Sequence, residues 1–153
     1  MTNLLRLAIV VSSFILLASC GVPPKQMYDG PRLIPESEAV LIGDVVSPAS
    51  GGRVVITRVD GKSAVGLAAL LSTNMFPYPH GVFILPGDHE ISTKFVRDGS
   101  GFGGVDGKLQ FHAEAGKTYF IHATRQGSSV SFWIEDISTG HAVEGIDRDK
   151  STH

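Results

Sequence analysis

Residues 109–136 read LQFHAEAGKTYFIHATRQGSSVSFWIED. Apolar and polar residues alternate along three runs, which are Leu109–Glu114, Thr118–Arg125 and Val130–Asp136, and glycine-containing turns separate these runs. Alternation is typical of strands with one buried face, because successive side chains of a strand point to opposite sides. The stretch therefore predicts three antiparallel strands.

The turns between these runs predict a register. A three-residue loop at 115–117 places His112 opposite Phe120, and a tight turn at Gln126-Gly127 places Trp133 opposite Phe120. The second face of this sheet then carries His112, Phe120, His122 and Trp133, and it either packs under residues 64–80 or forms an exposed patch that faces a ligand. The first face is expected to be core and carries Leu109, Phe111, Ala113, Tyr119, Ile121 and Ala123.

The remainder of residues 39–146 shows the same signals. Asp-Gly occurs four times in the chain, and both residues tolerate the positive φ angles of tight turns. We therefore predict one all-β domain, a β-sandwich of about seven strands. Residues 64–76 fit either a short helix or an irregular crossover, residues 99–107 a glycine loop, and residues 147–153 a disordered tail. The further strands are expected at Ala39–Val46, Arg53–Val59, Val82–Leu85 and His89–Arg97.

The N-terminal segment has the pattern of an export signal. Arg6 precedes an uncharged, largely apolar run, Leu7–Leu17. A bilayer-spanning helix needs about 20 apolar residues, whereas this run has the length of a signal peptide's central region. Residues 1–19 are therefore predicted to be a signal-peptide helix.

The run ends in Leu17-Ala18-Ser19-Cys20, which contains the only cysteine of the chain. This stretch resembles the lipobox of bacterial lipoproteins. The resemblance implies cleavage between Ser19 and Cys20, a diacylglyceryl group on the Cys20 thiol, and attachment to a membrane through that lipid. The alternative is an ordinary signal peptide followed by a chance or buried thiol.

Two further features bear on location and partners. Gly21 follows Cys20, where many lipoproteins of the inner membrane carry aspartate, so the resemblance implies the periplasmic face of the outer membrane rather than the inner membrane. Residues 20–38 hold four of the eight prolines and predict an extended, flexible tether. The net charge is −2 and no basic cluster occurs, so nucleic acid is not an expected partner.

Two turn motifs support a second resemblance. Val59-Asp60-Gly61-Lys62, followed by LPGDHEI at residues 85–91, resembles PEGA-type domains of bacterial surface proteins. The blocks at 113–119 and 133–136 are similar to small envelope lipoproteins. The resemblance implies a small immunoglobulin-like or transthyretin-like β-sandwich and no catalytic residues, although residues 64–80 are an insertion relative to the pattern.

Motifs of enzymes are weak in this chain. The G-x-G-x-x-G match at 99–104 leads into a strand instead of opening a helix, and no G-x-S-x-G motif occurs. We expect no enzyme, cofactor or metal, but a lipid-anchored interaction module with an envelope protein partner. The alternatives are an accessory lipoprotein of an envelope or secretion complex, or a lipoprotein that binds a small ligand or metal. The candidate ligand patch is His112, Glu114, Phe120, His122 and Trp133.

Overall fold

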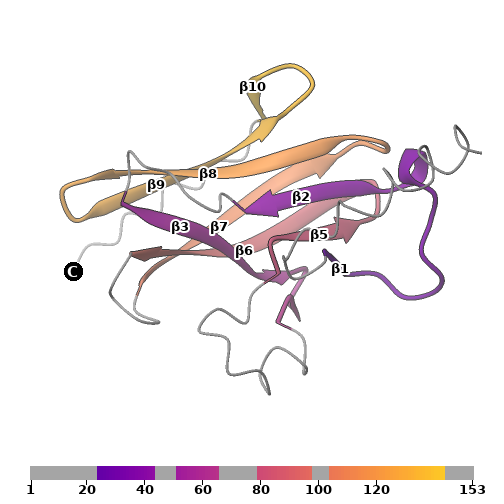
Figure 1. The fold of residues 1–153 in the computed structure, drawn as a ribbon, viewed down its shortest axis with the longest axis horizontal. Coiled ribbons are helices and arrows are strands. Elements are labelled where there is room, and N and C mark those ends of the chain that lie inside the picture. The colour runs from indigo at the N-terminus through magenta and orange to yellow at the C-terminus, as the bar shows by residue number, and fades with distance from the viewer. Residues whose placement is uncertain (1–23, 44–50, 66–78, 98–103, 144–153) are drawn as a thin grey trace, which may run out of the picture.

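The computed structural model describes residues 24–43, 51–65, 79–97 and 104–143. These residues form two β-sheets that pack face to face (Figure 1). The predicted all-β sandwich is therefore confirmed. The signal peptide, most of the 64–80 segment and residues 147–153 lie outside the described residues.

The first sheet has the strand order β1-β5-β2-β8-β9-β10. The β1–β5 and β2–β8 pairs are parallel, and the other neighbours are antiparallel. A one-turn 3-10 helix, η1 (Pro35–Ser37), precedes β2. The strands are β1 (Lys25–Gln26), β2 (Ala39–Gly43), β5 (Gly81–Ile84), β8 (Thr118–Gln126), β9 (Ser129–Asp136) and β10 (His141–Val143).

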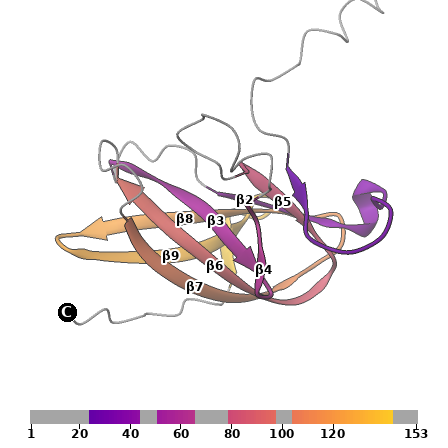
Figure 2. The same ribbon diagram turned by 90° about the horizontal axis from the view of Figure 1, so that it is seen from below.

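The second sheet is antiparallel throughout, with the order β4-β3-β6-β7. Figure 2 shows β3, β6 and β7 side by side. Seven of the described strands have four residues or more, in line with the predicted number, and the remaining three have two or three. The strands of this sheet are β3 (Gly52–Val59), β4 (Lys62–Ser63), β6 (Gly87–Arg97) and β7 (Gly104–Ala113).

The core lies between the two sheets and is built from alternate residues of each strand. The six residues predicted as core on β7 and β8 are all at most 5% exposed. Phe111 of β7 meets Tyr119 of β8 edge to face, with ring centroids 5.0 Å apart. The predicted core is thus confirmed, although its two halves come from opposite sheets and do not share one face: Leu109, Phe111 and Ala113 from β7, and Tyr119, Ile121 and Ala123 from β8.

The predicted hairpin at 115–117 is wrong. Among the described strands, β7 pairs with β6 over ten residue pairs, and β8 pairs with β2 and β9. The 115–117 turn instead carries the chain from one sheet to the other, where the Gly116 N–H donates to the Glu38 carbonyl. Alternation determines which side chains face inward, but it does not select the neighbouring strand. The partner that β7 has, β6, is longer than the predicted partner, β8.

The β8–β9 hairpin is confirmed with a shifted register. Its turn is Gly127-Ser128, so Trp133 lies opposite His122 and not opposite Phe120. Because the shift is two residues, every side chain stays on its predicted face. The strand β7 begins at Gly104, inside the predicted glycine loop. Gly107 is needed within this strand, since a Cβ there would lie 2.6 Å from the ring of Phe132.

Residues 24–38, which we call the strap, differ from the predicted flexible tether. Met27 donates its backbone N–H to the Phe83 carbonyl beside the β1–β5 pairing. Glu38 is 1% exposed and accepts a hydrogen bond of 2.6 Å from the Tyr28 hydroxyl. Burial, followed by this hydrogen bond, raises the pKa of Tyr28. A two-residue strand leaves no apolar periodicity, so no pattern in residues 24–38 predicts that the strap is docked.

Candidate functional site

Three aromatic side chains of β8 and β9 form a cluster on the outer face of the first sheet. Phe120 and His122 come from β8 and Trp133 from β9, at positions that alternate with the core residues. The rings of His122 and Trp133 stack with centroids 5.2 Å apart and an interplanar angle of 20°. The rings of Phe120 and His122 are tilted relative to one another, and their centroids lie 6.0 Å apart. We call Phe120, His122 and Trp133 the aromatic patch.

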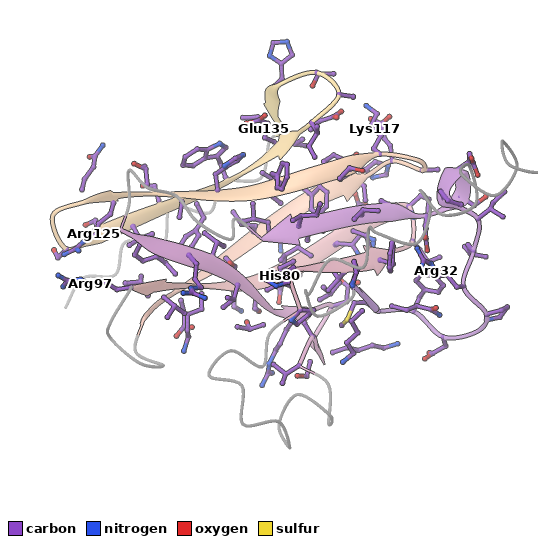
Figure 3. All side chains as sticks on the ribbon, viewed as in Figure 1. Arg32, His80, Arg97, Lys117, Arg125 and Glu135 are labelled. Carbon is purple, nitrogen blue, oxygen red and sulfur yellow. The ribbon has the colours of Figure 1, made fainter. Side chains whose placement is uncertain are left out.

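A carboxylate borders the aromatic patch. Glu135 places Oε2 3.2 Å from Nε2 of His122, and Figure 3 labels Glu135 on the side of the first sheet that faces away from the second. The side chains of His122 and Glu135 are 27% and 34% exposed. Next to β8, the half-buried Val40 and Ile42 of β2 extend the same face. The surface can therefore receive a flat or apolar group and one hydrogen-bonding group.

The predicted ligand set His112, Glu114 and His122 is not brought together. His112 lies on the outer face of the second sheet, where its Nδ1 is 2.8 Å from Oδ1 of Asp88. Glu114 follows β7 and pairs with Lys117 at 3.3 Å. The reason is the crossover at 115–117, which places β7 and β8 in different sheets. Within the described ranges, no three His, Cys, Asp or Glu side chains are grouped so that they could hold a metal ion.

A third histidine–carboxylate pair joins β6 to the β3–β4 turn. The His89 ring, 11% exposed, has Nδ1 2.7 Å from Oδ2 of Asp60 and Nε2 2.7 Å from the Leu85 carbonyl. Carboxylate and carbonyl oxygens are hydrogen-bond acceptors, so both ring nitrogens of His89 face acceptors of the fold. We call Asp60 and His89 the clamp.

The clamp also fixes the backbone. Asp60 accepts the Glu90 N–H through Oδ1 at 2.9 Å, and its own N–H donates to the Glu90 carbonyl at 2.8 Å. Asp60 has a φ of 49°, which Asp tolerates better than most residues. Asp60 and His89 belong to the two turn motifs, but no local pattern predicts that they meet, because 29 positions separate them. Their geometry makes them structural residues.

Two grooves border the clamp, and His89 contributes to the lining of both. One is lined by Asp88, Glu90, Gln110, Phe111 and His112. The other runs between the strap and the β3–β4 turn, where Lys62 pairs with Asp29 at 3.2 Å. Both grooves have charged walls, and the His89 ring between them is held by the fold on both of its nitrogens.

Asp136 lies next to Glu135 in β9 but points to the opposite side. Lys117 donates to it at 2.8 Å, and the Ser138 hydroxyl donates at 2.7 Å. The hydrogen bond from Lys117, followed by those from Ser138, lowers the pKa of Asp136 to about 2. Asp136, followed by Glu114, in turn raises the pKa of Lys117. This pair ties the 115–117 crossover to the β8–β9 hairpin.

The predicted cleavage and lipidation residues, Ser19 and Cys20, lie outside the described residues. In the part of the chain that the structure describes, no helix has the length and apolar character to cross a bilayer. Comparison with protein-family models, with curated proteins and with solved structures finds no match to this chain.

Proposed function

We propose that this chain is a bacterial lipoprotein, anchored through lipid on Cys20 to the periplasmic face of the outer membrane. Its β-sandwich is a non-enzymatic interaction module. The observation that carries the proposal is the position of the only cysteine, directly after Leu17-Ala18-Ser19 at the end of the apolar run. Gly21 after this cysteine favours the outer membrane over the inner membrane.

The chemistry of such an anchor is sufficient for stable attachment. Each buried CH₂ of an acyl chain contributes about 0.8 kcal/mol, and two or more chains on one residue make dissociation slow. The Cys20 thiol would receive a diacylglyceryl group, which supplies two acyl chains at once. Nothing in the folded domain is then needed to hold it at the membrane.

The aromatic patch supports the role of the domain. Aromatic side chains are enriched at protein interfaces, where they supply large contact areas at a small cost in conformational entropy. Phe120 and Trp133 lie on a sheet face with half-exposed neighbours, and Glu135 adds one hydrogen-bonding group at the border. We assign this face to an envelope protein partner, such as a component of a complex to which the lipoprotein is an accessory.

The geometry does not favour the alternative of a metal or small-ligand site. His112 and His122 lie on the outer faces of different sheets, so one ion cannot bind both. His112 and Glu114 are each engaged with a neighbouring charged side chain. The proposal accordingly assigns no metal, cofactor or reaction to the domain.

Replacing Cys20 tests the anchor. The Cys20→Ala chain should leave the membrane fraction and appear in the soluble envelope fraction, because it lacks the thiol that receives lipid. Ser19→Ala is the matched control, since alanine is also small and the cysteine remains, and it should stay in the membrane. Mass spectrometry of the mature N-terminus should find an acylated Cys20. A free thiol at Cys20, or Cys20→Ala that remains membrane-bound, would contradict the proposal.

A further inference from the structure

The docked strap shortens the link between the proposed anchor and the folded domain. Lys25 belongs to β1 and pairs with Val82, so the chain between Cys20 and the sandwich spans five residue steps. A fully extended chain covers at most about 3.6 Å per residue, which limits this link to roughly 18 Å. If residues 21–38 were all a polyproline-like tether, they would reach roughly 55 Å. The start of β1 would therefore lie within roughly 18 Å of the acylated cysteine.

One end of the sandwich exposes apolar side chains close to this link. Among the described residues, the exposed large apolar side chains include Leu33 (38%), Ile34 (64%) and Leu85 (40%). Leu33 and Ile34 lie in the strap just before η1, and Leu85 follows β5. These segments meet at one end of the molecule because β2 starts opposite the end of β5, with Ala39 next to Ile84.

The exposed apolar side chains are held there by an ordered loop. The Leu33 N–H donates to the Tyr28 hydroxyl at 3.0 Å, and that hydroxyl donates to the buried Glu38. The Ser37 N–H donates to the Ile34 carbonyl at 2.9 Å and closes the turn of η1. The Arg32 guanidinium lies 3.8 Å from the centre of the Phe83 ring and fixes the loop to β5.

We propose that this end of the sandwich docks on the lipid surface that carries the anchor, with Leu33, Ile34 and Leu85 entering the headgroup region. We call these three residues the apolar end. The proposal rests on the lipid anchor of the proposed function. The link supplies a high local concentration of lipid, so that a weak apolar contact suffices for docking. Apolar side chains of proteins that lie on a membrane are buried roughly 5–10 Å into the boundary between headgroups and acyl chains, a depth that side chains projecting from one loop and one turn can reach.

Docking at this end would set the orientation of the domain. Figure 3 labels Arg32 near the apolar end and Arg125 at the opposite end, where the β8–β9 hairpin turns. The hairpin turn then points away from the membrane. The aromatic patch, on the outer face of β8 and β9 between these ends, would remain open to a partner.

Fluorescence quenching in vesicles tests the inference with the full acylated chain. Because acylation occupies the only native thiol, one new cysteine can be labelled with an environment-sensitive dye. Glu36→Cys reports on the apolar end and Ser128→Cys, in the β8–β9 turn, is the matched control. The vesicles contain phosphatidylethanolamine, phosphatidylglycerol and a quencher-labelled phosphatidylcholine. The dye at residue 36 should lose several-fold more of its emission than the dye at residue 128, because only residue 36 lies beside the side chains that enter the headgroup region.

A second variant separates apolar docking from simple proximity. In the Glu36→Cys chain, replacement of Leu33, Ile34 and Leu85 by serine should bring the quenching down to the level of the Ser128 control. These side chains are exposed, so thermal unfolding should confirm that the variant is folded. Equal quenching at both dyes, or quenching unchanged by the three serines, would overturn the inference. Flotation of the protein with the vesicles reports separately on the anchor: protein that floats without this difference refutes docking alone, and protein that does not float refutes the proposed function.

Discussion

Two contacts pair a histidine with a carboxylate in different surroundings: His89 with Asp60 in the clamp, and His122 with Glu135 at the border of the aromatic patch. His89 is 2.7 Å from Asp60 and 11% exposed, whereas His122 is 3.2 Å from Glu135 and 27% exposed. In the clamp, both ring nitrogens contact acceptors of the fold, and the carboxylate also holds the backbone of Glu90. In the patch, the histidine ring presents its face to aromatic neighbours.

The difference lies in what each pair connects. Asp60 and His89 come from a turn and a strand that are far apart in the sequence, so their contact closes the second sheet at its end. His122 and Glu135 come from two strands of one hairpin that already share eight residue pairs. The hairpin does not depend on their contact. The clamp therefore continues the β3–β6 pairing beyond its last residue pair, Val59–Ile91, whereas the His122–Glu135 contact lies within strands that are already paired on both sides of it.

The largest effect is expected from breaking the clamp. Asp60→Ala removes the acceptor of His89 Nδ1 and of the Glu90 N–H, and it places alanine at a φ of 49°. We expect a loss of about 2–3 kcal/mol in the free energy of unfolding, because two hydrogen bonds are lost and a backbone N–H is left without its partner. Urea denaturation of the two chains measures this difference in the free energy of unfolding.

Asp60→Asn is the matched control for this variant. Asparagine tolerates a positive φ and keeps an oxygen for the Glu90 N–H, so it should lose only about 1 kcal/mol, from the weaker contact with His89. If Asp60→Ala unfolds at the same urea concentration as the unmodified chain, the clamp is not structural and the comparison with the aromatic patch fails.

A smaller effect, visible only in acid, distinguishes the adjacent carboxylates Asp136 and Glu135. The pKa of Asp136 falls from 3.8 to about 2 because Lys117 and then Ser138 donate to the ionised form. A lowered pKa contributes stability that is fully present above pH 3.8 and is lost as the pH falls towards 2. Asp136→Asn should remove this part of the acid dependence of the unfolding temperature.

Glu135→Gln is the control for Asp136→Asn, because it alters the neighbouring carboxylate on the patch side of the strand. It should leave the slope of unfolding temperature against pH below 3.8 unchanged, since the bonds from Lys117 and Ser138 to Asp136 remain. Parallel pH profiles for Asp136→Asn and the unmodified chain would show that the Lys117 pair does not stabilise the folded state.

Alternation along the chain predicted which residues are buried, but not which strands are neighbours. The inward positions of β7 and β8 follow directly from the sequence, since a strand has a period of two. The pairing of β7 with β6 depends on long-range contacts between residues such as Gly87 and Ala113, for which a single sequence has no local signal. The error in pairing explains why the predicted ligand set, which spans β7 and β8, is divided between two sheets.

The parts of the site that lie within one hairpin were predicted better. Phe120, His122 and Trp133 share a face as expected, because a two-residue error in register preserves the face. The clamp and the strap depend on contacts over long sequence separations and were not foreseen. Glu38 is an example, as a carboxylate in a proline-rich segment gives no indication that it is buried under Tyr28 and Arg32.

The smallest effect on stability, and the most informative for function, is expected from Trp133→Ser. The ring is half-buried on the outer face of the first sheet and stacks on His122, so we expect the free energy of unfolding to fall by about 1 kcal/mol. Binding of an envelope partner should suffer far more, since a central aromatic residue of an interface often contributes about 2 kcal/mol or more.

Cross-linking in the native membrane measures this second effect. A photoreactive residue at Ser131, which is exposed on the same face of β9, should trap a partner in the unmodified background and trap much less of it with Trp133→Ser. Lys108, exposed on the outer face of the second sheet, is the matched control position and should trap the partner in neither background. If the Ser131 cross-link persists with Trp133→Ser, the aromatic patch is a feature of the fold, like the clamp. If the cross-link is lost while stability changes little, the two histidine–carboxylate pairs differ in function as they do in geometry.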